Sequence, residues 1–122
     1  MSAVDLLQHL MLTIDQRKWG ELGGFLSPDF TCEYVHTGER FGRDEWIRVN
    51  AEYPGFDRLI LQQITGDDRT AACRSHVTGR GDTGLMHFEC ATFVTVKDGR
   101  VAQMVEVWAD AGQAVPGEAR PV

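Results

Sequence analysis

Apolar residues recur at helical spacing in the first part of the chain. Ser2 followed by Asp5 resembles a capping box, so a first helix is predicted at about residues 3–18. Its buried side would carry Leu6, Leu7, Leu10, Met11 and Ile14. A shorter apolar pattern over residues 19–26 predicts one or two helical turns, and Asp44 can cap a third helix that ends before Pro54. Three helical segments are therefore expected before residue 55.

The rest of the chain has the alternation and composition of β-strands. A short strand is predicted at residues 30–34, and β-branched and aromatic residues mark four more at 56–65, 70–78, 85–96 and 100–110. Short Gly- and Asp-containing connections between these four predict antiparallel neighbours. The expected fold is an α+β domain at residues 1–110, in which three helices cover one face of a curved antiparallel sheet. Residues 111–122 lack periodicity, and we expect a flexible tail.

Length and composition restrict the class of function. The 122 residues are 43% hydrophobic and 25% charged, which suits one globular domain. A formal net charge of −6 argues against a nucleic-acid partner. The chain has no apolar run long enough to cross a membrane and no export signal at its start, so we expect a cytoplasmic protein without a membrane partner. Three widely separated cysteines favour core thiols over disulfides.

Three segments carry a resemblance to a known family. They read QRKWGELGGFLSPDFTCEY, GRDEWIRV and VKDGRVAQMVEVWAD. Their sequence and order resemble the SnoaL-like, ketosteroid isomerase-like branch of the nuclear transport factor two-like superfamily, over about residues 3–110. The resemblance implies a cone-shaped roll in which the bent sheet wraps the helices around a deep apolar cavity. Members include isomerases, polyketide cyclases, a dehydratase, an epoxide hydrolase and binding proteins that catalyse nothing, so the fold alone does not choose a function.

The last predicted strand holds the first candidate for chemistry. Alternation places Met104, Glu106, Trp108 and Asp110 on one face, and the resemblance implies that this face lines the cavity. Similar cyclases carry an acid/base carboxyl close to the position of Glu106. A carboxyl between apolar walls loses hydration, which raises its pKa toward neutrality. The alternative is that Glu106 faces solvent or a partner chain.

The strand at residues 70–78 offers a second set of polar residues. Arg74 and His76 share one face, and Cys73, Ser75 and Val77 share the other. The resemblance implies that the first set faces the cavity, where Arg74 would stabilise an anion and His76 would exchange protons with the carboxyl of the last strand. Because the exposed face of an antiparallel sheet is commonly polar, the alternative is that both side chains are solvated.

Three further residues are candidate ligand contacts. Tyr34 falls close to where the similar steroid isomerases have their proton-transferring aspartate, a position without an acid here, and its phenol can donate to a substrate oxygen. His36 follows on the same face of that strand. Glu89 belongs to the strand at residues 85–96, for which hydrophobicity and the resemblance point opposite faces inward, so both orientations stay open. The histidine spacing does not predict a metal site, and we expect no metal and no cofactor.

The preferred interpretation is a cofactor-free acid/base enzyme of the isomerase, dehydratase, cyclase or hydrolase type. Its substrate would be a mainly apolar small molecule, polyketide- or steroid-like by resemblance, held inside the cone. The alternative is a binding or accessory protein with the same pocket and no turnover. We also expect a homodimer through the outer sheet face, where Val101, Val105 and Val107 would form an apolar patch.

Overall fold

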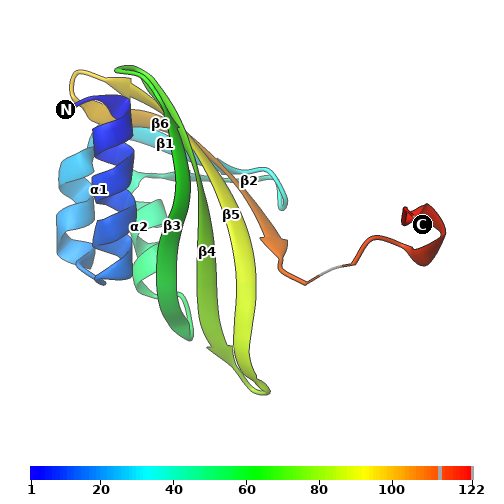
Figure 1. The fold of residues 1–122 in the computed structure, drawn as a ribbon. Helices are drawn as coiled ribbons and strands as arrows, with labels where there is room; N and C mark the ends of the chain where they lie inside the picture. Colours follow the sequence, from blue (N-terminus) through cyan, green and yellow to red (C-terminus); the bar gives the residue numbers. More distant parts are fainter. Residues whose placement is uncertain (113, 122) are drawn as a thin grey trace.

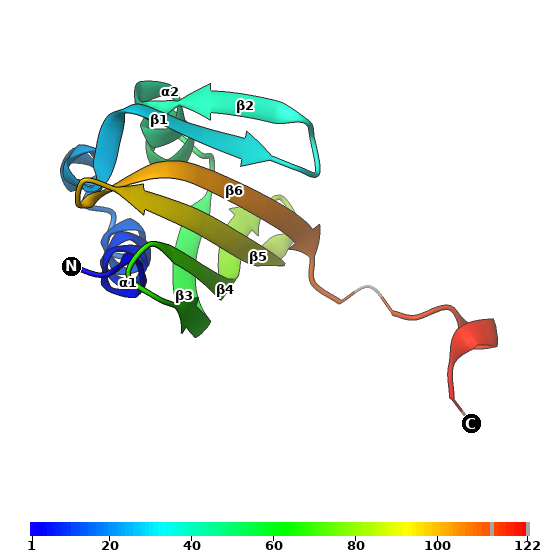
Figure 2. The ribbon, with the colours of Figure 1, turned by 90° about the horizontal axis from the view of Figure 1, so that it is seen from above.

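The computed structural model describes residues 1–112 and 114–121 as a curved sheet with helices on its concave face (Figures 1 and 2). The helices are α1 (Ala3–Asp15), the 3-10 helix η1 (Trp19–Phe25) and α2 (Arg43–Ala51). The strands are β1 (Leu26–Tyr34), β2 (Glu39–Gly42), β3 (Phe56–Gly66), β4 (Thr70–Gly81), β5 (Gly84–Lys97) and β6 (Arg100–Asp110). Beyond β6 the chain leads away from this body and holds a last 3-10 turn, η2 (Gly117–Ala119) (Figure 1).

The six strands lie in the order β2-β1-β6-β5-β4-β3. Strands β3 to β6 form the antiparallel meander that their short connections predict. Strand β1 pairs with β6 in parallel, which is possible because β2, α2 and three strands separate the two along the chain. The predicted α+β class with helices inside a curved sheet is confirmed, and the sheet is mixed through this one pair.

Several element boundaries differ from the sequence prediction, among them the start of β1, four residues early, and the end of β4, three residues late. Helix α1 ends at Asp15, three residues early, and Arg17 then turns the chain with a φ of 58°. Gly42, not Asp44, caps α2, and its N–H donates to Glu45 Oε1 at 2.9 Å. The four-residue strand β2 was not predicted, because its sequence is polar and ends in glycine.

The core lies between the helices and the concave side of the sheet. Leu7, Leu10 and Phe30 are at most 1% exposed, and the Phe30 and Trp46 rings pack 5.5 Å apart. Helix α1 is joined to β3 at its last residue, where Asp15 Oδ1 accepts from Leu59 N at 2.9 Å.

The three cysteines are free and buried, as expected of core thiols. No helix in the described part of the chain is long and apolar enough to span a membrane.

Candidate functional site

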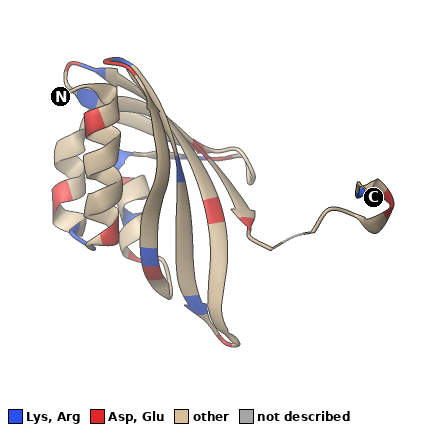
Figure 3. Cartoon of the chain, viewed as in Figure 1, with Lys and Arg blue, Asp and Glu red and all other residues tan. Residues whose placement is uncertain are grey.

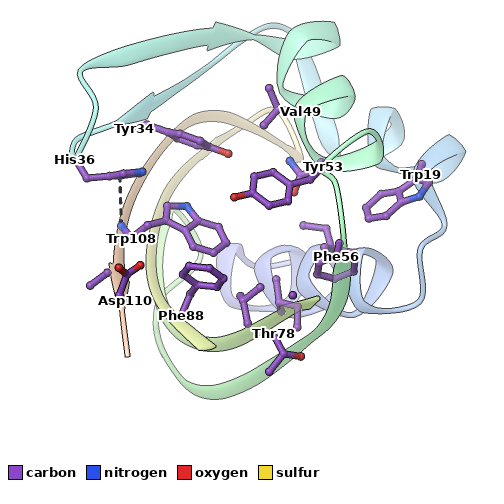
Figure 4. A pocket seen from close by; sticks show the side chains of 16 residues that line it. Trp19, Tyr34, His36, Val49, Tyr53, Phe56, Thr78, Phe88, Trp108 and Asp110 are labelled. Atoms are coloured by element: carbon purple, nitrogen blue, oxygen red, sulfur yellow. Dashed lines mark hydrogen bonds between the residues drawn. The ribbon is translucent and has the colours of Figure 1, made fainter. Parts of the chain in front are cut away.

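A pocket of about 530 Å³ opens where the concave face of the sheet extends beyond the helices (Figure 4). Residues from all three helical segments and five strands contribute to its wall. The lining residues are Ile14, Trp19, Tyr34, His36, Val49, Asn50, Tyr53, Phe56, Leu59, Val77, Thr78, Gly79, Phe88, Trp108, Ala109 and Asp110. Both tyrosines and two of the three tryptophans of the chain are among them. The pocket is therefore aromatic, which suits an apolar ligand.

Four of the residues predicted from the sequence line this pocket: Tyr34, His36, Trp108 and Asp110. The His36 ring stacks on Tyr34 with centroids 5.3 Å apart, and its Nδ1 accepts from the Trp108 backbone N–H at 3.4 Å. That contact leaves the proton of a neutral His36 on Nε2. Burial, followed by the charge of Glu106, raises the pKa of the Tyr34 phenol, so Tyr34 is a neutral donor.

Glu106 points inward, as the resemblance implies, but it lies in the core instead of lining the pocket. It is 4% exposed, and Met104, the preceding inward residue on β6, is 2% exposed and also part of the core. In the parallel β1–β6 register Glu106 pairs with Tyr34, which does line the pocket. The carboxyl is therefore one layer behind the pocket wall.

The buried carboxyl is surrounded by weak and neutral donors. Trp46 Nε1 donates to Oε1 at 3.0 Å, while Cys90 Sγ and Thr92 Oγ1 lie 3.1 Å and 3.3 Å from Oε2. Cys32 Sγ lies 3.9 Å from Oε1. In the described part of the chain no Lys, Arg or His forms an ion pair with Glu106. Burial consequently raises the pKa of Glu106 and outweighs the hydrogen bonds that oppose it.

The same burial affects the thiols beside the carboxyl. Burial first, and the Glu106 charge second, raise the pKa of Cys32 and of Cys90. Both side chains therefore remain protonated thiols that donate to the carboxyl instead of acting as nucleophiles. Trp46 was not predicted as a partner of Glu106, because its helical spacing indicates only that it faces the core.

The expectation that Arg74 and His76 join Glu106 in one cavity is wrong. Both lie on the outer face of the sheet, where Arg74 Nη1 is 3.2 Å from Glu89 Oε1 and His76 Nδ1 is 3.3 Å from Glu89 Oε2. His76 Nε2 is also 2.9 Å from His87 Nδ1, and Arg74 bonds Gln62. Glu89 is likewise outside the pocket. These residues form a polar cluster of their own on the convex side.

The burial of the alternate residues of β4 explains why Arg74 and His76 face outward. The alternate residues Cys73, Ser75 and Val77 are at most 6% exposed and take the inner face of β4. The β4–β5 pairing has no register shift, so the more apolar face of β5 is also the inner one and Glu89 stays outside. Hydrophobicity predicted this orientation correctly, and the orientation carried over from the resemblance was wrong.

The sequence pattern does not indicate that several of the lining residues face the pocket. Trp19 comes from the 3-10 helix, Tyr53 follows α2, and Phe56 starts β3. Strand alternation cannot orient side chains at such ends, so their convergence depends on the tertiary fold. The described residues include no group of three or more His, Cys, Asp or Glu that could hold a metal ion.

We predict that Glu106→Gln raises the melting temperature at pH 7 to 8 and that this gain shrinks toward pH 4. A carboxyl whose folded pKa is raised contributes full stability below its unfolded pKa of about 4.3, and loses it as pH rises through the folded value. Glutamine does not ionise and so avoids the loss, which is worth about 1.4 kcal/mol for each unit of pKa difference. Thermal unfolding of both proteins across this pH range measures the trend.

Arg74→Met serves as the control for that experiment. Its guanidinium lies on the opposite side of the sheet from Glu106, so the variant should leave the pH trend intact. A Glu106→Gln difference that is constant from pH 4 to 8 would show that the carboxyl pays no desolvation cost.

Comparisons with known proteins find the same fold in solved structures. A candidate ketosteroid isomerase from Kribbella flavida is 29% identical, with a TM-score of 0.82, over 96% of this chain and 84% of that one. An epoxide hydrolase from Mycobacterium tuberculosis is 14% identical with a TM-score of 0.74, covering 88% and 82%. A candidate SnoaL-like polyketide cyclase from Shewanella denitrificans is 10% identical with a TM-score of 0.72, covering 86% and 88%.

The last two similarities concern the fold alone. No curated protein matches the sequence. The SnoaL-like domain matches residues 7–104, which include α2, most of α1, most of the sheet and most of the core. The chain belongs to the SnoaL-like domain family.

Proposed function

We propose that this protein binds a mainly apolar small molecule in the aromatic pocket at the open end of the cone. The observation that carries the proposal is the pocket itself, which has a volume of about 530 Å³ and walls made chiefly of aromatic and aliphatic side chains. This volume is in the range of sites that bury a drug-sized ligand. A ligand there would cover the ring of Tyr53, which is 57% exposed and lies across the pocket in Figure 4.

A small residue in the wall allows a direct test. A side chain added at Gly79 would start 3.9 Å from the ring of Phe88 and 3.5 Å from the Gly55 carbonyl, which are ordinary contacts. Gly79→Met should therefore fold, occupy part of the pocket and weaken binding of the neutral dye N-phenyl-1-naphthylamine about tenfold, equivalent to about 1.4 kcal/mol. Fluorescence titration gives the dye Kd.

Gly24→Met is the matched control, because a side chain at Gly24 meets nothing within 4 Å and Gly24 does not line the pocket. It should bind the dye like the parent. Equal binding by all three proteins would place the dye elsewhere and contradict the proposal.

Acid/base turnover of the bound molecule, without a cofactor, is the second candidate. It is favoured by one observation, the pairing of buried Glu106 with Tyr34 across β1 and β6. Tyr34 would donate its phenol proton to a substrate oxygen, while the carboxyl behind it tunes that phenol. Since Arg74 and His76 lie outside the pocket, His36 and Asp110 are the remaining lining side chains with a basic atom that could accept a proton from a ligand.

Hydrogen exchange into an apolar ketone tests turnover without a known substrate. If the pocket stabilises an enolate, the protein should accelerate deuterium incorporation next to the carbonyl of 2-tetralone in D₂O, followed by NMR. Tyr34→Phe should reduce the acceleration about 100-fold, the usual cost of one oxyanion donor. Exchange at the buffer rate, with the ketone demonstrably bound, would leave binding in place and exclude this chemistry for ketones.

We also propose that two copies of this chain pair through the outer face of the sheet. Phe93 and Val107 on that face are 48% and 39% exposed, and Ile60 is 42% exposed. The Arg74 and Glu89 pair beside them carries both charges, so two copies can approach without net repulsion. Val101 does not belong to this patch, because a register shift beside Val96 leaves Val101 fully buried.

Sedimentation at micromolar concentration tests this pairing. The parent should sediment as a dimer, and Phe93→Glu with Val107→Glu should sediment as a monomer, because each introduces a charge into the apolar patch. Leu12→Glu on the exposed side of α1, where Leu12 is 52% exposed, is the control that should remain a dimer. A parent mass close to one chain would refute the pairing.

A further inference from the structure

The pocket has an unusual distribution of charge. Among the described residues that line it there is no Lys or Arg, and Asp110 is the one acidic side chain. In the described residues Asp110 has no ion pair. Elsewhere, charges of both signs are interspersed over helices and strands (Figure 3). A chain with a net charge of −6 reinforces the negative potential at this pocket.

The acidic side chain is placed beside aromatic faces. In the β5–β6 register Phe88 pairs directly with Asp110, and Trp108 is the preceding inward residue on β6. Directly opposed side chains on one face have Cβ atoms about 5 Å apart. The Phe88 and Trp108 rings pack edge to face with centroids 6.5 Å apart. A carboxylate and two aromatic rings therefore converge at one end of the pocket (Figure 4).

The opposite end has the reverse character. Trp19 and Phe56 lie there in Figure 4, across the pocket from His36 and Asp110. The Arg17 guanidinium stands 5.3 Å from the centroid of the Phe56 ring and bonds the backbone carbonyls of Phe56 and Asp57. This end therefore already has a cation against its aromatic wall and disfavours a second one.

The polar atoms of the wall include both donors and acceptors, and Trp108 Nε1 is a buried donor without a partner among the described residues. Asn50 Nδ2 donates to the Trp46 carbonyl at 2.9 Å, which leaves the acceptor Oδ1 for a ligand. His36, with its Nδ1 accepting from Trp108 N, is compatible with a neutral ring. Aromatic faces and carboxylates attract ammonium groups, whereas an anionic ligand would find no cationic side chain among the described lining residues at the Asp110 end.

We infer that the pocket takes an organic cation, with an ammonium group held between Asp110, Phe88 and Trp108 and an aromatic or aliphatic body extending toward Phe56. This inference deepens the proposed function and rests on it, since it names the ligand class of the same pocket. The ammonium would stay at the open, partly hydrated end, where its desolvation is smallest.

Three phenyl compounds that differ in charge test the inference. N,N,N-trimethylanilinium and tert-butylbenzene have the same shape, and benzenesulfonate supplies the anion. Calorimetric titration of the full chain at low salt should give a lower Kd for the cation than for its neutral isostere, and no binding of the sulfonate. Asp110→Asn should weaken the cation about three- to tenfold and leave the neutral compound unchanged, the range for one partly exposed charge pair.

Asp98→Asn is the matched control, because it removes the same charge at the other end of β6. It lies about 30 Å away along an extended strand and should leave cation binding unchanged. Equal Kd values for cation and neutral isostere, or equal losses in the Asp110 and Asp98 variants, would overturn the inference while the pocket still binds apolar molecules. Failure of the neutral dye and all three compounds would overturn the proposed function as well.

Discussion

The length of the strands relative to the helices determines where this protein can hold a ligand. Strand β5 has 14 residues and extends about 46 Å, whereas α1 has 13 residues and is about 20 Å long. A single layer of short helices cannot cover the whole concave face of such a sheet. One end of that face is packed into the core, and the uncovered end becomes the pocket.

The inward residues of β6 follow this change from core to pocket. Met104 is packed in the core, Glu106 lies fully enclosed, Trp108 is a pocket wall and Asp110 reaches the exposed end. The Glu106 carboxyl is shielded from water by the core and does not face the pocket, where a ligand would bind. Its hydrogen bonds come from an indole, a hydroxyl and thiols, which stabilise a carboxylate less than a cation would. The raised pKa of Glu106 is therefore a consequence of its place along the strand.

The sequence predicts the parts of this arrangement that depend on local periodicity. Alternation grouped Glu106 and Trp108 on one face of the last strand, and the resemblance correctly pointed that face inward. For Arg74 and His76 the resemblance pointed the wrong face inward, although the small and apolar alternates Cys73, Ser75 and Val77 indicated the opposite choice. The aromatic wall was only partly predictable, since Trp19, Tyr53 and Phe56 belong to element ends whose orientation is set by packing between distant segments.

The two faces of the sheet differ in how their charged and polar groups are paired. On the convex side Arg74 forms an ion pair with Glu89, and His76 contacts Glu89 and His87, so the fixed charges of this cluster are paired and partly screened by solvent. On the concave side the polar groups are mostly neutral, and the carboxyl at the open end has no partner among the described residues. These two sets of side chains point to opposite faces of the sheet. Removing the Arg74 charge from the convex face therefore does not offset the removal of a charge from the pocket wall. The preference of the pocket for one ligand charge therefore depends on the few groups of its own wall.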